Sequence, residues 1–227
     1  MTFYDKVQEY DWEEVRRAIY AKTAADVERA LGCTGTLSLD DFMALVSPAA
    51  EPYLEKMAQK SYAITRRRFG NVMQLYTPLY LSNFCLNRCV YCGFSALNKI
   101  KRAALTPQEI DDECRAIRRH PFENILLVTG ESPHKYGVQY LGDAIVQTKK
   151  YFENISIEVQ PLDTDEYKEL VDKGLYSVSV YQETYNEKRY PEYHLGGKKR
   201  DYRYRLETAD RLGEAGIYKV GLGALLG

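Results

Sequence analysis

Apolar and polar residues follow two different patterns along the chain, one before and one after about residue 72. In the first part, apolar positions recur three or four residues apart, as in residues 11–19 and 23–31. This is the period of an amphipathic helix. Further helices are predicted at about residues 37–46 and 51–68. Residues 1–72 are therefore predicted to form an N-terminal helical extension.

From residue 73, short apolar runs alternate with amphipathic helical stretches, which is typical of a parallel sheet built from strand–helix–strand units. Thr106, Pro107 and Glu109 give a clear start signal for one helix, with an N-cap, a proline at the first helical position and a capping box. The predicted strands are 74–81, 125–129, 155–159, 177–181 and 219–222, and the predicted helices are 107–119, 139–151, 164–172 and 202–215.

This pattern predicts one α/β domain over residues 73–227, either a β/α barrel or an open doubly wound sheet. Both architectures place their chemistry at the carboxyl ends of the strands. Polar residues and glycines gather there: the cysteine run 85–92 follows the first strand, Gly130 and Glu131 the second, Glu158 and Gln160 end the third, Gln182, Glu183 and Tyr185 follow the fourth, and Gly221 and Gly223 lie on the fifth.

Composition and charge exclude several classes of function. A hydrophobic content of 45% supports a sizeable core, and a formal net charge of -1 does not favour nucleic-acid binding. The triplet at residues 66–68 is a short arginine run and is interpreted as a solvated helix face. No apolar run approaches the roughly 20 residues that cross a bilayer, and the first residues lack the layout of a signal peptide. We expect a cytoplasmic protein that binds neither nucleic acid nor membrane.

Three of the five cysteines, Cys85, Cys89 and Cys92, are crowded within eight positions. Three thiolates can hold three irons of a four-iron cluster and leave the fourth iron open for a small molecule. The alternatives are a zinc site or a closed electron-transfer cluster. A structural zinc site requires a fourth Cys or His at close spacing, and no second CxxC is present in the sequence. The spacing favours the open cluster.

The other candidate residues each have a structural alternative. Gly130 and Glu131 could form an ordinary turn, and Glu158, in an apolar strand, could form an internal salt bridge. Tyr185 is one of 20 tyrosines and could serve in packing. His194, in a loop, could be merely solvated. Gly221 and Gly223 could simply belong to a closely packed strand. Cys33 and Cys114 are interpreted as small buried or partly buried side chains rather than as metal ligands.

The cysteine run, with Tyr91 before its last cysteine and Gly93 after it, resembles the signature of the radical S-adenosylmethionine (SAM) enzymes. The resemblance implies a TIM-like β/α barrel, here with about five β/α units, and a [4Fe-4S] cluster whose open iron binds S-adenosyl-L-methionine. It also implies cleavage of SAM to a 5'-deoxyadenosyl radical. Thr129 stands where the family's glycine-glutamate motif has a first glycine. The implied cofactor-binding residues are Tyr91, Gly130, Glu131, Glu158, Gln182, Arg205, Gly221 and Gly223.

Several further stretches resemble one branch of that superfamily, the aromatic amino acid lyases and above all the 2-iminoacetate synthase family of thiamine thiazole biosynthesis. They are residues 77–83, 158–162, 182–185, 194–202 and 223–227. The resemblance implies cleavage of the Cα–Cβ bond of L-tyrosine to 2-iminoacetate (dehydroglycine) and p-cresol, with 5'-deoxyadenosine and methionine as coproducts. It implies catalytic roles for His194, Glu183 and Tyr185, a thiazole synthase as partner, and a flavodoxin or ferredoxin as reductant.

Two alternatives remain at this point. One is the related tyrosine lyase of hydrogenase maturation, which makes carbon monoxide and cyanide and has a second cluster near its C-terminus. The other is a non-catalytic iron-sulfur or scaffold fragment. A complete eight-unit barrel takes about 250 residues, whereas residues 73–227 provide about 155. We therefore expect a C-terminally truncated chain that lacks the last strands of the barrel and part of the substrate pocket.

Overall fold

A computed structural model of the chain describes residues 1–226. Gly227, the last residue of the glycine-leucine stretch at 223–227, lies outside the described residues. The chain divides into two compact units. One comprises Gln8–Met73, and the other comprises Met1–Val7 together with the chain from Gln74 onward.

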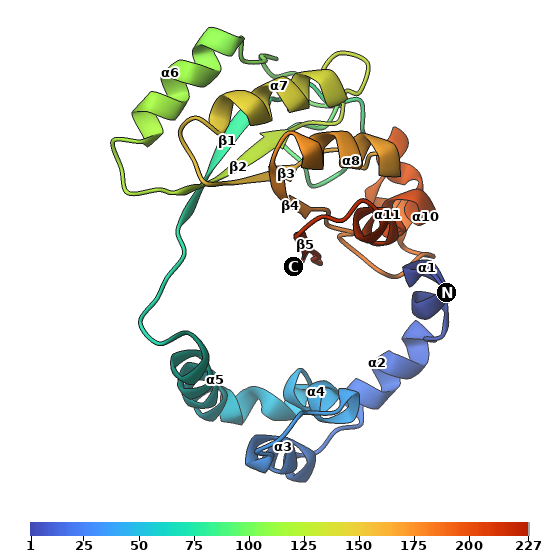
Figure 1. The fold of residues 1–227 in the computed structure, drawn as a ribbon. Helices are drawn as coiled ribbons and strands as arrows, with labels where there is room; N and C mark the ends of the chain where they lie inside the picture. Colours follow the sequence, from blue (N-terminus) through green and yellow to red (C-terminus); the bar gives the residue numbers. More distant parts are fainter. Residues whose placement is uncertain (227) are drawn as a thin grey trace. The chain divides into compact units, whose positions relative to one another are not determined.

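The unit Gln8–Met73 is helical, which confirms the predicted N-terminal helical region. Thr23 and Ser38 each close a capping box at the start of a helix. Each box satisfies backbone N–H groups that a helix leaves unpaired at its first turn. Val27, Ala44 and Ala50 form the buried core of this unit. Its elements are α2 (Trp12–Tyr20), α3 (Ala24–Gly32), α4 (Leu39–Leu45), the 3-10 helix η1 (Pro48–Tyr53) and α5 (Leu54–Phe69) (Figure 1).

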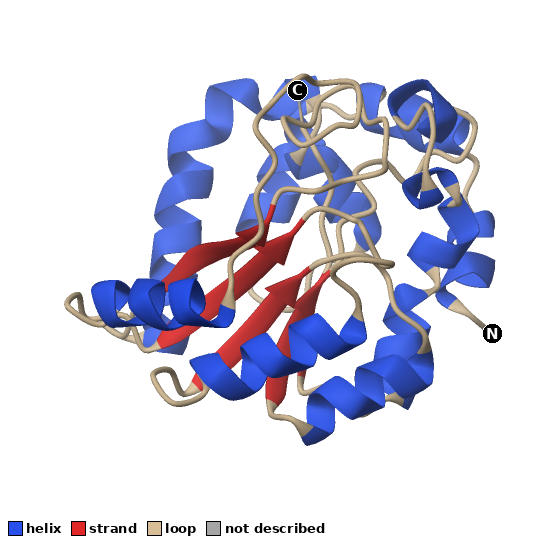
Figure 2. Cartoon of the chain, turned by 90° about the horizontal axis from the view of Figure 1, so that it is seen from above, coloured by secondary structure: helices blue, strands red, loops and turns tan. Residues whose placement is uncertain are grey.

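The other unit is a five-stranded parallel sheet with helical connections, which confirms the predicted α/β class (Figure 2). Its strands are β1 (Tyr76–Ser82), β2 (Asn124–Thr129), β3 (Asn154–Glu158), β4 (Leu175–Ser179) and β5 (Lys219–Gly221). Its helices are α1 (Phe3–Gln8, whose last residue falls in the other unit), α6 (Pro107–Ile117), α7 (Val138–Thr148), α8 (Thr164–Asp172), α9 (Tyr190–Tyr193), the 3-10 helix η2 (Lys198–Arg200), α10 (Tyr202–Leu206) and α11 (Thr208–Glu214).

The strand order distinguishes the two predicted architectures. The strands pair in chain order, β1-β2-β3-β4-β5, and the helices α6, α7, α8 and α11 contact one another in the same order. A doubly wound sheet would instead reverse its strand order at a switch point. The observed order is that of consecutive β/α units, as in the first part of a β/α barrel.

The two faces of the sheet differ in what they contact. Leu79, Leu81, Ile125 and Leu127 alternate along β1 and β2, are buried, and pack with residues of α6, α7 and α8 in the main core. The residues between them lie on the opposite face of the sheet and line a cavity: Tyr76, Pro78, Tyr80, Leu126 and Val128. The period-2 pattern of a strand therefore builds the core and one wall of the site together.

The first helix, α1, belongs with the sheet rather than with the helical unit. The Phe3 amide donates to the Asp210 carboxylate at 3.1 Å, and the rings of Phe3 and Tyr185 lie 6.2 Å apart. The predicted division at residues 72 and 73 thus falls one residue from the change of unit at Met73 and Gln74, while the first seven residues group with the sheet.

The helix α6 begins with the predicted cap, since the Glu109 amide donates to Thr106 Oγ1 and the Thr106 amide donates to the Glu109 carboxylate at 2.8 Å. Within residues 1–226, no helix is both long enough and apolar enough to cross a membrane.

The α6 cap gives a test of the fold. Replacing Thr106 by Ala removes the acceptor of the Glu109 amide and should lower the free energy of unfolding by about 1 kcal/mol. Denaturant unfolding followed by circular dichroism measures it. Glu113→Ala, at an exposed position of the same helix, should change stability much less, and an equal loss in both variants would contradict the cap's contribution.

Candidate active site

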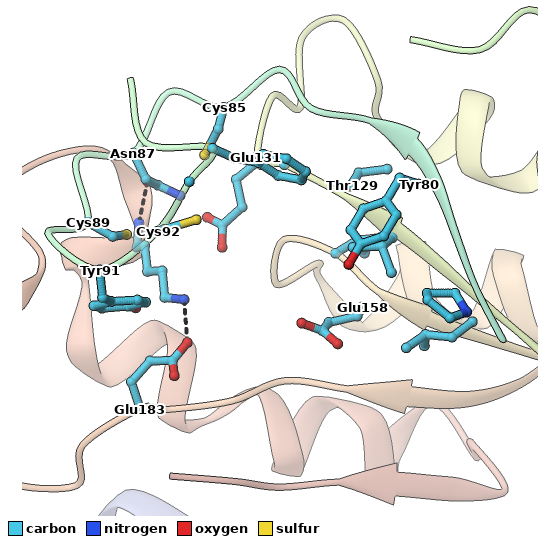
Figure 3. Close-up of a pocket in the computed structure, with 18 of the residues that line it drawn as sticks. Tyr80, Cys85, Asn87, Cys89, Tyr91, Cys92, Thr129, Glu131, Glu158 and Glu183 are labelled. Carbon is cyan, nitrogen blue, oxygen red and sulfur yellow. Dashed lines mark hydrogen bonds and ion pairs between the residues drawn. The ribbon is translucent and has the colours of Figure 1, made fainter. Parts of the chain in front are cut away.

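A cavity of about 820 Å³ lies over the carboxyl ends of the strands (Figure 3). Four groups of side chains line it: the three cysteines of the 85–92 run, an aromatic and apolar wall from β1 and β2, three carboxylates from the loops and from β3, and two cations. The lining residues are Tyr76, Pro78, Tyr80, Cys85, Asn87, Cys89, Tyr91, Cys92, Gly93, Phe94, Leu126, Val128, Thr129, Gly130, Glu131, Glu158, Val159, Glu183, Lys199 and Arg205.

The three predicted metal ligands are brought to this one cavity by the loop that follows β1. Cys89 is buried, while Cys85 and Cys92 are partly exposed. Burial raises the pKa of the Cys89 thiol to about 11, so a bound metal must compensate the cost of forming its thiolate there. Among the described residues, no three Cys, His, Asp or Glu side chains form a site for a single metal ion. A four-iron cluster gives each thiolate its own iron, so its thiolates need not meet at one point.

Gly130 explains how the cluster loop can lie so close to the sheet. A Cβ atom at this position would lie 2.4 Å from the Phe84 carbonyl oxygen and 3.0 Å from Cys85 Cβ. The Gly130 amide donates to the Ser82 carbonyl, and the Leu86 amide donates to the Glu131 carbonyl at 3.0 Å. The end of β2 and the start of the cysteine run are therefore in backbone contact, which any larger side chain at position 130 would prevent.

Glu131 and Arg205 form a buried ion pair beside the cysteines. Arg205 Nη1 lies 2.7 Å from Glu131 Oε1, and the two side chains are 6% and 10% exposed. Arg205 Nε donates to the Tyr181 carbonyl. The other carboxylate oxygen, Glu131 Oε2, is buried and has no hydrogen-bond partner in the described part of the chain. Because a buried unpaired acceptor is costly, this oxygen is a ready acceptor for a ligand's N–H group.

Glu158, at the end of β3, points into the same cavity (Figure 3). It forms no ion pair with any described residue, so the predicted alternative of an internal salt bridge is not seen. Burial, and then the neighbouring Glu183 carboxylate, raise the pKa of Glu158. Two hydroxyl groups of a ligand, each donating to one of its oxygens, would stabilise this carboxylate.

A second ion pair joins Glu183 to Lys199 across the cavity, with Lys199 Nζ 2.8 Å from Glu183 Oε1. The same ammonium lies 5.6 Å from the centre of the Tyr91 ring. Glu183 has a φ of 69°, and no other non-glycine residue among the described ones has a positive φ. A left-handed backbone is strained for a residue with a side chain, and here it accompanies a carboxylate that faces the cavity.

His194 is fully buried, and its side chain contacts the cavity lining through Tyr91. Its Nδ1 lies 3.0 Å from the Tyr190 carbonyl oxygen, which can only accept, so Nδ1 bears the proton. Its Nε2 therefore accepts from the Tyr91 hydroxyl, at 2.7 Å. Burial lowers the pKa of His194 to about 4. The histidine is thus neutral near pH 7, and it holds the Tyr91 ring in place.

The remaining predicted site residues lie beside the cavity rather than in its lining. Tyr185 packs against Phe3, and Gln182 is buried with its Nε2 donating to the Tyr202 carbonyl. A Cβ atom on Gly221 would lie 2.6 Å from Ser179 Oγ, and one on Gly223 would lie 2.7 Å from the Tyr181 ring. The two glycines therefore permit the close packing that was their structural alternative. Their roles toward a ligand, and that of Tyr185, stay predictions.

Sequence reasoning missed several lining residues, among them Tyr80, Asn87 and Lys199. Tyr80 could have been found, because Tyr76, Pro78 and Tyr80 are two residues apart and therefore share the inner face of β1. Asn87 accepts from the Lys199 amide at 3.0 Å, and this contact spans 112 positions of the chain. No local pattern indicates it.

The residues present fit the group that the cysteine spacing predicts. Three thiols lie at one end of the cavity, where a four-iron cluster would use them as ligands. Beside them, the free oxygen of Glu131 suits an ammonium group, the Arg205 guanidinium suits a carboxylate, and Glu158 suits a diol. An amino acid joined to a nucleoside presents all three of these groups.

Comparison with known proteins agrees with this arrangement. The family described as the radical SAM superfamily matches residues 79–227. The chain is 52% identical over 226 residues to the 2-iminoacetate synthase of Salmonella typhimurium and 53% identical to that of Escherichia coli. Each alignment covers 100% of this chain and 60% of the relative, so the chain spans about three-fifths of the length of these curated relatives.

A solved structure shows the same fold. The crystal structure of HydG, a maturase of the [FeFe]-hydrogenase, is similar with a TM-score of 0.86 and 28% sequence identity. The alignment covers 94% of this chain and 50% of that one.

The Gly130 contact gives a test of the site. Gly130→Ala should push the cysteine run away from β2, because its Cβ would overlap the Phe84 carbonyl. Hydrogen–deuterium exchange should then become faster for the amides of residues 84–92. The control is Gly213→Ala, in α11, where an added Cβ would have no atom within 4 Å. Unchanged exchange in the Gly130 variant would contradict the contact.

Proposed function

Because the chain belongs to the radical SAM superfamily, we propose that its cavity binds a [4Fe-4S] cluster through Cys85, Cys89 and Cys92 and binds SAM beside it. The observation that supports this most is that the three thiols and the unpartnered Glu131 Oε2 line one cavity. When bound, the cluster supplies the electron that cleaves the sulfonium of SAM and releases the 5'-deoxyadenosyl radical.

The surrounding residues would orient SAM by its three polar ends. Glu131 Oε2 would accept from the ammonium group and Arg205 would donate to the carboxylate, so that one buried ion pair binds both ends of the amino acid moiety. Glu158 would accept from the ribose hydroxyls. The adenine ring would lie beside the main chain at Gly221 and Gly223, two residues that pack closely on the Ser179 and Tyr181 side chains.

Tyr91, Glu183 and Lys199 would shape the space next to the cofactor. Tyr91 is held from behind by His194, so its ring presents a fixed surface. Lys199 pairs with Glu183 inside the cavity and fixes the position of that carboxylate. His194, predicted as catalytic, would then act through Tyr91 as a positioning residue. Tyr185 and Gln182 would support the loop after β4, which carries Glu183.

We further propose L-tyrosine as the substrate and 2-iminoacetate and p-cresol as products. The similarity to two 2-iminoacetate synthases supports this, and so does the aromatic and apolar wall of the cavity on β1 and β2, against which a phenol ring could pack. The Cα–Cβ bond of tyrosine breaks, and methionine and 5'-deoxyadenosine are the coproducts. Two electrons and one proton from outside complete the balance, so an electron carrier is required.

The partners follow from this chemistry. A flavodoxin or ferredoxin would supply the electrons, and a thiazole synthase would consume the iminoacetate.

The likeness to HydG favours a second candidate function, that of a tyrosine lyase of hydrogenase maturation. A cluster-binding chain without turnover is the third. The activity, the substrate and the partners are proposals, since the chain spans 60% of the synthases it matches.

Cluster binding can be tested without turnover. Anaerobic reconstitution with iron and sulfide should give the broad visible absorbance of a [4Fe-4S] cluster, and replacing Cys85, Cys89 or Cys92 singly by Ala should abolish most of it. Cys33→Ala, which changes a partly exposed cysteine of the helical unit, should leave it unchanged. Full absorbance in any of the three variants would refute that ligand.

The reaction is tested by adding dithionite, SAM and L-tyrosine to the reconstituted protein and separating the products by chromatography. We expect 5'-deoxyadenosine, p-cresol and glyoxylate, the hydrolysis product of iminoacetate, and none of them from Cys92→Ala. Absence of 5'-deoxyadenosine would exclude SAM cleavage by this chain. Its formation without p-cresol would exclude tyrosine as the substrate, and cyanide with p-cresol would favour the hydrogenase-maturation reaction.

A further inference from the structure

The loop with the cysteines pairs with the loop after α9 to form a short two-stranded ribbon. The Arg88 amide donates to the Gly196 carbonyl, the Leu195 amide to the Arg88 carbonyl and the Val90 amide to the Tyr193 carbonyl, at 2.9 to 3.0 Å. Cys89 and His194 lie opposite each other in this ribbon as an antiparallel bridge.

Alternate residues of the ribbon face opposite ways, as in any extended pair. Cys89 and His194 are 4% and 0% exposed and face inward. Val90, Tyr193 and Leu195 are 55%, 37% and 47% exposed. The outward-facing Val90 is therefore the direct neighbour in the chain of Cys89, which lines the cavity.

The outer side is apolar at its centre and positively charged around it. Arg88 is exposed, and its methylene groups would lie 3.2 Å from a Cβ on Gly196. Arg200 Nη1 donates to the Leu195 carbonyl, and Lys198 is exposed two residues before it. None of these three cations forms an ion pair with a carboxylate of residues 1–226. The ribbon face, as we name it, comprises Arg88, Val90, Tyr193, Leu195, Lys198 and Arg200.

Two carboxylates are adjacent in sequence to the ribbon face. Glu192 lies 3.3 Å from Arg189 in an ion pair, and Asp201 accepts from the Tyr204 amide at the start of α10. The local excess of positive charge therefore stands out on a chain whose formal net charge is only -1. Exposed apolar side chains surrounded by unpaired cations are suited to a partner with a negatively charged rim.

We propose that the ribbon face binds an acidic one-electron carrier protein of the flavodoxin or ferredoxin class. This rests on the proposed function, which requires electrons from outside. Each transfer would move one electron: a flavin hydroquinone would become the semiquinone, and the cluster that Cys89 would help to hold would gain that electron. Docking here leaves the cavity free for small molecules, because Cys89 faces the cavity while Arg88 and Val90 face away from it.

The proposed contact is of the transient kind. Complexes between redox proteins bury little surface. Attraction between opposite charges therefore raises the association rate more than it prolongs the lifetime of the complex. The carrier should therefore reduce the cluster fast at low salt and slowly at high salt, since ions screen exposed charges. Dithionite, a small reductant, needs no docking surface.

The test compares the reconstituted parent protein with Arg88→Glu/Lys198→Glu and with the control Lys150→Glu, which reverses an exposed charge after α7, near the start of β3. Stopped-flow absorbance follows cluster reduction by recombinant flavodoxin hydroquinone and, separately, by dithionite. Titration of oxidised flavodoxin gives its Kd. We expect the double variant to lose at least about tenfold in flavodoxin-driven rate and in affinity, with the dithionite rate and cluster absorbance retained, and the control to match the parent.

Two results would overturn the proposal: an unchanged flavodoxin-driven rate in the double variant, or loss of binding to a thiazole synthase with flavodoxin binding intact. Should the double variant fail to hold a cluster, the salt dependence of the parent protein decides, because a flavodoxin-driven rate that is independent of salt would also contradict docking on this face. The dithionite reaction with SAM separates a failure of this proposal from a failure of the proposed function.

Discussion

The close backbone contact between the end of β2 and the start of the cysteine run is the constraint on which the site depends. Gly130 lies so near the Phe84 carbonyl that no Cβ fits between them, and the Leu86 amide bonds to the Glu131 carbonyl on the other side of the same junction. Cysteines in a long loop would otherwise lose much conformational entropy on converging. Here the sheet fixes the loop at one end, and the ribbon with residues 193–196 fixes it at the other.

Around that junction, each buried ionisable group either pairs with a protein group or faces the cavity, where a ligand would bind. Arg205 pairs with one oxygen of Glu131, and the other oxygen has no hydrogen-bond partner among residues 1–226. Lys199 pairs with Glu183, whereas Glu158 forms no ion pair with a cation of the same residues, and burial raises the pKa of Glu158. A buried ion pair adds little net stability, because desolvation offsets its attraction. Together with the strained backbone of Glu183, this arrangement is explained better by ligand binding than by folding.

The fold was largely predictable because its signals are local. Period-2 and period-3.6 patterns located all five strands and most helices, and Thr106 marked the start of α6; β4 begins two residues earlier than predicted, at Leu175. Gly130, Glu131 and Glu158, predicted as site residues from their position at strand ends, line the cavity. Asn87 and Lys199 were missed, and His194 was expected in a solvated loop or in the active site, because their environments depend on contacts between distant loops. Burial of His194 behind Tyr91 has no signature in the sequence near residue 194.

We propose above all that three thiolates hold a four-iron cluster with one iron free to bind SAM. Mössbauer spectroscopy of protein reconstituted anaerobically with ⁵⁷Fe, recorded before and after adding SAM, tests this most directly. We expect the signal of one iron in four to change when SAM is added, while the signals of the other three stay the same. Four irons unaffected by SAM, or protein that retains zinc in place of iron, would contradict it.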